Sequence, residues 1–78
     1  MTVNELIQEA LAKLDGAGGR VVLDFSSIRR IDPSAIGAME KLAGVADEKA
    51  VKVALCGVNV DVYKVLKLVK LTPRFSFE

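Results

Sequence analysis

Apolar and polar residues follow two different periods along this chain, and their alternation predicts helices and strands in turn. Apolar residues recur every three to four positions in three segments, residues 3–14, 34–47 and 60–71. Short continuous apolar runs occupy residues 21–25 and 51–56, and such runs are typical of strands covered on both faces of a parallel sheet. Phe75 and Phe77 alternate with polar neighbours, which predicts a short last strand.

Local signals mark where the helices begin and end. Thr2 followed by Glu5 fits a capping box. Asp32 before Pro33 fits an N-cap and a first-turn proline for the second helix. The glycine-rich stretch at residues 15–19 follows a helix and precedes a strand, which reverses the order of a phosphate-binding loop. We therefore interpret this stretch as a connector.

The order helix, strand, helix, strand, helix, strand with short connections predicts an α/β fold. We expect a small, mostly parallel sheet of three to four strands with helices packed on it and right-handed crossovers, in a single domain over residues 1–78. The core must be mainly aliphatic, because hydrophobic residues make up 51% of the chain and aromatic residues only 5%.

Composition and charge argue against several classes of function. A net charge of +1 predicts no nucleic-acid binding, and no apolar run approaches the roughly 18 residues of a membrane span. The lone Cys56 cannot form an internal disulfide, so we expect a reduced, cytoplasmic setting. The chain has no histidine and no glycine-rich loop between a strand and a helix, so we expect neither an enzyme nor a bound cofactor. The spacing of Asp24, Asp32 and Asp61 fits no metal-binding motif.

The most informative stretch is residues 23–37, where a strand leads through a short loop into Asp32-Pro33-Ser34 at a helix start. This order predicts an exposed serine hydroxyl at a helix N-terminus, beside an acid. Ser34 is then either merely a helix-capping residue or a site of phosphorylation. A phosphate adds about −1.5 to −2 charge, which a helix N-terminus tolerates. Phosphorylation would therefore switch binding rather than unfold the domain.

The residues around Ser34 resemble those of the STAS domain, the anti-sigma-factor antagonist family. The resemblance lies in Leu-Asp-Phe-Ser at residues 23–26 and Ile-Asp-Pro-Ser-Ala-Ile-Gly at residues 31–37, and the later elements stay in the family's order. Ser34 aligns with the serine that is phosphorylated in many members. Two positions depart from the family's pattern: Pro33 replaces a serine and Ala35 replaces a glycine.

This resemblance implies a bacterial, cytoplasmic regulatory domain without enzyme activity. It would act in signal transduction and transcription regulation by binding an anti-sigma factor or a related serine kinase, with Ser34 as the phosphorylated residue. The alternative, which Pro33 and Ala35 keep open, is a STAS-type accessory subunit that binds the ATPase of an ABC (lipid) transporter without phosphorylation. The residues expected to contact a partner are Asp24, Ser26, Ser27, Arg29, Arg30, Asp32, Ile36, Met39, Glu40 and Lys41.

Simpler roles stand beside some of these assignments. Asp24 is alternatively interpreted as a cap on nearby backbone groups, and Arg29 and Arg30 as an ordinary solvated pair. The resemblance also implies that strands before the first helix and a helix after residue 78 are missing. We therefore expect an open sheet edge, and a homodimer or strand addition at that edge.

Overall fold

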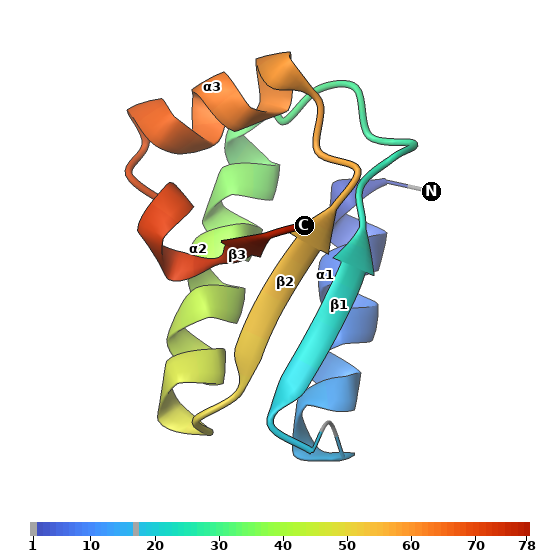
Figure 1. Ribbon diagram of the computed structural model, residues 1–78, viewed down its shortest axis with the longest axis vertical. Helices are drawn as coiled ribbons and strands as arrows, with labels where there is room; N and C mark the ends of the chain where they lie inside the picture. The colour runs from blue at the N-terminus through green and yellow to red at the C-terminus, as the bar shows by residue number, and fades with distance from the viewer. Residues whose placement is uncertain (1, 17) are drawn as a thin grey trace.

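Three parallel strands form the centre of the structure, a computed structural model that describes residues 2–16 and 18–78 (Figure 1). The strands are β1 (Arg20–Asp24), β2 (Lys52–Cys56) and β3 (Ser76–Phe77). Their order in the sheet is β1-β2-β3, and both neighbouring pairs are parallel. Arg20 lies opposite Lys52 and Asp24 opposite Cys56. The predicted α/β class with a small parallel sheet is confirmed.

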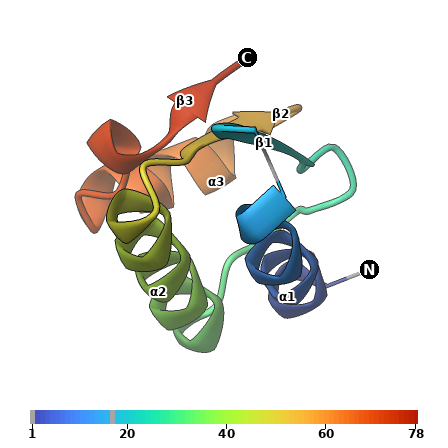
Figure 2. The same ribbon diagram turned by 90° about the horizontal axis from the view of Figure 1, so that it is seen from below.

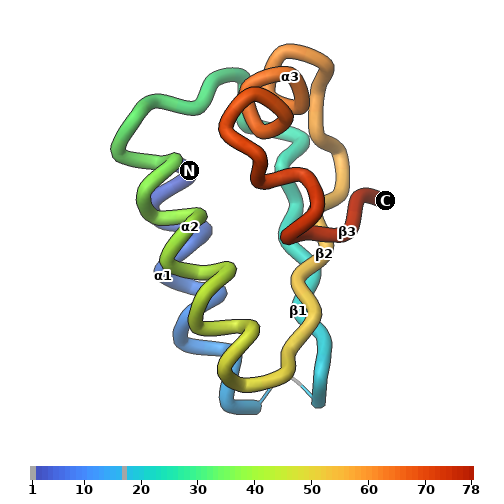
Figure 3. Tube along the Cα trace, turned by 90° about the vertical axis from the view of Figure 1, so that its left-hand side faces the viewer, coloured from blue at the N-terminus to red at the C-terminus, as the bar shows by residue number. Residues whose placement is uncertain are grey.

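The helices lie on one face of this sheet and at one of its ends. They are α1 (Val3–Lys13), α2 (Pro33–Glu48) and α3 (Val60–Leu68), with short 3₁₀ turns η1 (Leu14–Gly16) and η2 (Thr72–Arg74). Figure 2 shows α1 and α2 side by side on the same face of the sheet. Figure 3 and Figure 1 show α3 at the end of the sheet where β1 and β2 finish. The fold therefore has two main layers, with α3 closing one end.

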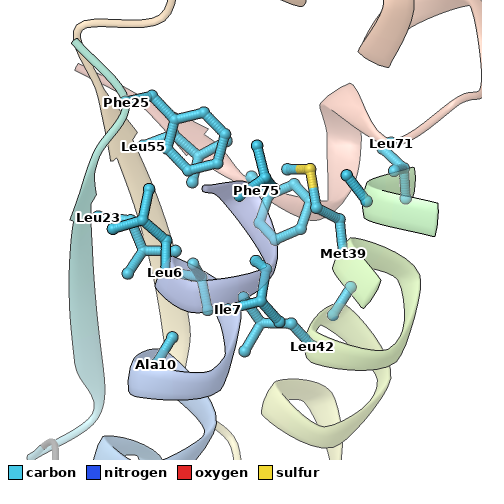
Figure 4. Close-up of a cluster of buried hydrophobic side chains, with 14 of the residues drawn as sticks. Leu6, Ile7, Ala10, Leu23, Phe25, Met39, Leu42, Leu55, Leu71 and Phe75 are labelled. Atoms are coloured by element: carbon cyan, nitrogen blue, oxygen red, sulfur yellow. The ribbon is translucent and has the colours of Figure 1, made fainter. Parts of the chain in front are cut away.

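The core lies between the sheet and the helices, where side chains from the strands, α1 and α2 meet (Figure 4). Ile7 from α1, Met39 and Leu42 from α2, Leu55 from β2 and Phe25 just after β1 have no exposed surface. No polar or charged residue is buried in the described part of the chain. Burial of this aliphatic cluster is the main stabilising contribution, since each fully buried side chain of this size adds about 1.5–3 kcal/mol.

The face of the sheet opposite the helices has no helical cover among the described residues (Figure 2). Side chains of β1 alternate between exposed and buried, and Val22 is 50% exposed. The expectation that both apolar runs are covered on both faces is therefore wrong for β1. It holds better for the central strand β2, where Val53, Ala54 and Leu55 are all buried.

Both α2 and α3 end in a left-handed turn that the sequence pattern did not reveal. After α2, Ala50 has φ of 56°, and the N–H of Val51 donates to the carbonyl of Ala46 at 2.9 Å. After α3, Lys70 has φ of 62°, and Leu71 donates to Leu66 at 2.8 Å. This is the Schellman arrangement, usually made with glycine at the left-handed position. It ends α3 at Leu68 instead of the predicted residue 71.

Ala50→Gly is expected to stabilise the protein by about 1 kcal/mol, because glycine adopts the left-handed conformation without the steric cost that a Cβ adds. Chemical denaturation monitored by circular dichroism measures this. The matched control is Glu48→Gly, at the last residue of α2, which should destabilise by roughly 0.5–1 kcal/mol. Equal effects of the two substitutions would contradict the assignment of this turn.

Candidate functional site

The loop between β1 and α2 is held at three points and displays its polar residues. Ile28 is buried, and its N–H donates to the carbonyl of Phe25 at 2.9 Å. Asn59, the N-cap of α3, donates from Nδ2 to the carbonyl of Ile28 at 3.1 Å. Asp24 accepts the N–H of Ser26 at 2.8 Å. The remaining loop side chains are exposed on a fixed backbone, namely Ser26, Ser27, Arg29 and Arg30.

Gly57 brings the loop after β2 against this same segment. Its φ is +69°, and a Cβ built on it would lie 2.9 Å from the Cβ of Ser26. A side chain at position 57 therefore has neither the backbone conformation nor the space that it needs. The two loops at the carboxyl ends of β1 and β2 pack directly on each other.

Ser34 is exposed at the second residue of α2, the placement that the sequence predicted. Asp32 is the N-cap, and its Oδ1 accepts the N–H of Ala35 at 2.8 Å. The hydroxyl of Ser34 donates to the same Oδ1 at 3.0 Å. Asn4 donates from Nδ2 to Ser34 Oγ at 3.3 Å, across from α1. Ser34 Oγ thus lies between an acid and an amide on the protein surface.

The start of α1 lies beside the start of α2. Thr2 caps α1 in the predicted capping box: Thr2 Oγ1 accepts the N–H of Glu5 at 3.2 Å, and Glu5 Oε1 accepts the N–H of Thr2 at 3.1 Å. Figure 3 shows the two helices running in the same direction. The positive ends of both helix dipoles therefore meet near Ser34.

Two shallow hollows flank the exposed arginines of the loop. One, of about 320 Å³, is lined by the starts of both helices and by the loop; its residues include Asn4, Arg29, Arg30 and Asp32. The other, of about 390 Å³, lies toward α3, where the two arginines meet Asp61 and Val65. We call the surface made by Asn4, Arg29, Arg30, Asp32 and Ser34 the Ser34 face.

The acids of this region are held in their charged form. The N–H of Ala35 and then the hydroxyl of Ser34 lower the pKa of Asp32 by hydrogen bonding to its carboxylate. Ser26, through its side chain and then its N–H, lowers the pKa of Asp24 in the same way. Both effects stabilise an anion, so Ser34 has a carboxylate as its neighbour at neutral pH.

The structure brings together only part of the predicted contact set. Asp32, Arg29, Arg30 and Ser27 line the hollow beside Ser34. Asp24 does not line it and instead caps the turn after β1, which is its simpler predicted role.

Positions along α2 divide between two sides of the helix. Helical spacing places Lys41, which is exposed, on the same stripe as Ser34. The half-buried Ile36 and the exposed Glu40 lie on the other flank. Met39 has no exposed surface because it packs in the core, so the prediction that it contacts a partner is wrong.

Sequence reasoning missed Asn4 and the loop-holding role of Asn59. Asn4 is an unremarkable polar residue in the first turn of α1, and only the packing of α1 against α2 brings it to Ser34. Asn59 was not among the residues predicted for the site. Its Oδ1 caps α3 by accepting the N–H of Val62, and its Nδ2 holds the loop by donating to the carbonyl of Ile28. Among the described residues, no group of three or more histidine, cysteine or acidic side chains is placed to bind a metal ion.

The structure thus combines a three-stranded parallel sheet, helices packed on one of its faces and an exposed serine at the start of α2. Comparison with protein-family models identifies the family: the STAS domain model matches residues 1–78. The chain therefore belongs to the STAS domain family, whose members mediate protein–protein interactions. Neither the curated proteins nor the solved structures contain a match. In the described part of the chain, no helix has the length and apolar character needed to cross a membrane.

Asp32→Ala is expected to lower the thermal midpoint at neutral pH, because it removes the N-cap of α2. The pKa of Asp32 is lowered in the folded state, so its carboxylate stabilises the fold above its unfolded pKa. This stabilisation is lost as the pH falls through the folded pKa. The midpoints of wild type and Asp32→Ala should therefore converge in acid, measured by calorimetry as a function of pH.

Asp32→Asn is the matched control for this experiment. Asparagine also caps a helix but does not titrate, so its midpoint should stay close to that of wild type at neutral pH. A difference between wild type and Asp32→Ala that stays constant down to strong acid would contradict a capping role for the charged carboxylate.

Proposed function

We propose that this STAS domain is a phosphorylation-controlled binding partner of an anti-sigma factor or a related serine kinase, in a cytoplasmic regulatory system. The partner binds the Ser34 face together with Ser26 and Ser27, and Ser34 is the modified residue. The observation that carries the proposal is the exposed Oγ of Ser34 at the second residue of α2, beside a loop held rigid by Ile28 and Asn59.

The fold around Ser34 supports a phosphate at this position. Ser34 is exposed, so a phosphate stays hydrated and displaces no core residue. The N-termini of α1 and α2 both direct positive dipole ends toward it. Arg29 and Arg30 are exposed on the same face and add two positive charges. The domain should therefore remain folded when Ser34 is phosphorylated.

The same geometry explains how a phosphate would release a partner. Asp32 Oδ1 accepts the Ser34 hydroxyl at 3.0 Å, and phosphorylation replaces this hydrogen bond by repulsion between two anions. A partner seated on this face would also have to desolvate the new charge, which costs several kcal/mol when no paired cation compensates it. Binding weakens while folding does not.

A second candidate is an accessory subunit that binds an ABC transporter ATPase without phosphorylation. The observation that favours it is the state of the Ser34 hydroxyl, which already bonds to both Asp32 and Asn4. A kinase must break these contacts to reach Oγ. Ala35 is also buried, so it contributes no side chain to a kinase recognition surface.

Ser34→Asp is expected to weaken binding to the partner by roughly tenfold or more, because a desolvated charge opposes the interface. Ser34→Ala should bind like wild type and should lose the phosphate that the kinase adds to wild type. The partner is first captured with the wild-type domain and identified by mass spectrometry. Affinities are then measured by calorimetric titration.

Leu68→Glu is the matched control, because it adds one negative charge at a residue of α3 that is 81% exposed. It should leave the affinity unchanged, and circular dichroism should show all three variants folded. Capture of an ATPase whose affinity is the same for wild type and Ser34→Asp would overturn the phosphorylation proposal in favour of the second candidate.

A further inference from the structure

Among the described residues, no strand pairs with the outer edge of β1. In the described part of the chain, β1 pairs only with β2. The N–H of Lys52 donates to the carbonyl of Gly19 at 2.9 Å, and the N–H of Phe25 donates to the carbonyl of Cys56 at 2.8 Å. Because backbone groups alternate along a strand, the N–H and C=O groups of Arg20, Val22 and Asp24 point away from β2.

The side chains of these same three residues are exposed on the sheet face opposite the helices. Arg20, Val22 and Asp24 are exposed, whereas Val21 and Leu23 between them are buried. The edge therefore presents a cation, a half-exposed apolar residue and an anion in a row. Arg20 and Asp24 lie two residues on either side of Val22.

The charges of this row are complementary to those of a second, antiparallel copy of β1. In an antiparallel pair centred on Val22, Arg20 lies opposite Asp24 of the second copy, and Val22 lies opposite Val22. The two-fold axis repeats the Arg20–Asp24 pair on the other side, as a symmetric dimer requires. All three positions direct their backbone groups at the partner, so each pair exchanges two hydrogen bonds.

Neighbouring groups favour this pairing over a parallel one. A hollow of about 380 Å³ is lined by Lys13, Gly16, Arg20 and Val22, so there is open space beside these residues of β1. Arg20 already pairs with Glu78, but its guanidinium has further N–H donors for a second carboxylate. A parallel pair in register would instead place like charges opposite each other.

We propose that two copies of this chain associate through antiparallel pairing of β1 with β1, centred on Val22, to give a continuous six-stranded sheet. The dimer buries the exposed Val22 side chains against each other and satisfies the free edge of the strand. The Ser34 face includes none of these edge residues. The dimer proposal therefore does not rest on the proposed phosphorylation.

Sedimentation equilibrium from about 10 µM to about 1 mM tests this association, a range suited to a small interface. In the dimer, residue 20 of each copy faces residue 24 of the other. Arg20→Asp or Asp24→Arg alone therefore places like charges opposite each other at two equivalent positions. Each single substitution should raise the dimer Kd by roughly tenfold. The double variant Arg20→Asp/Asp24→Arg restores opposite charges across the pair and should return the Kd to within about threefold of wild type.

Lys52→Asp is the matched control, because it reverses a charge on the neighbouring strand opposite Arg20, away from the edge. It should change the Kd far less than Arg20→Asp does. Circular dichroism of each variant shows whether it is folded. Because the charge swap is compared with its own single variants, loss of the Arg20–Glu78 pair alone does not imitate the expected rescue.

Amide hydrogen exchange measured by NMR locates the interface in wild type. The N–H of Val22 should become protected as the concentration rises, whereas the N–H of Val21, which faces β2, should be protected at every concentration. A wild-type chain that stays monomeric at about 1 mM would overturn the proposal. A dimer without concentration-dependent protection of Val22, or a double variant as weak as the single ones, would overturn it as well.

Discussion

Parallel pairing of β1 with β2 is the constraint on which the rest of the structure depends. Parallel neighbours need a connection that returns to the starting end of the sheet, and α2 provides it. α2 therefore begins at the end of the sheet where the strands finish, and α1, which leads into β1 through a short turn, begins at the same end (Figure 3). The loop after β1, the loop after β2 and the two helix starts meet there as a consequence. Ser34 lies where these loops and helix starts meet, so the topology itself places it at the surface.

Contacts of the loop after β1 fix the positions of its exposed side chains. Ile28 is buried, and Asn59 holds its carbonyl from the start of α3, so the loop cannot move without disturbing the core or the α3 cap. Gly57 allows the neighbouring loop to pack on Ser26 without a clash. Rigid support lowers the entropy lost when a partner binds. The exposed arginines and the serine are thus displayed by elements that fold for other reasons.

The domain has two distinct surfaces with different chemistry, one at the end of the sheet and one along the edge of β1. One end carries the Ser34 face, where the proposed phosphorylation would add charge at the protein surface. The free edge of β1 carries backbone donors and acceptors and a short charge pattern that is complementary to itself. The two surfaces share no residue, so association of two copies would not use the residues of the Ser34 face. A partner would then meet two equivalent sites in one particle.

Local sequence was sufficient for the features that depend on neighbours within a turn or a strand. The capping residues Thr2 and Asp32, the exposure of Ser34 and the α/β class all follow from spacing and residue type. Tertiary structure decided the features that depend on which surfaces meet. Val22 and Leu23 look alike in the sequence, yet only one is buried, because helices cover a single face of the edge strand. Packing likewise buried Met39, which was expected to contact a partner, and brought Asn4 beside Ser34. Periodicity shows which residues share a face of a helix, whereas packing determines which face meets the core and which neighbour lies beside it.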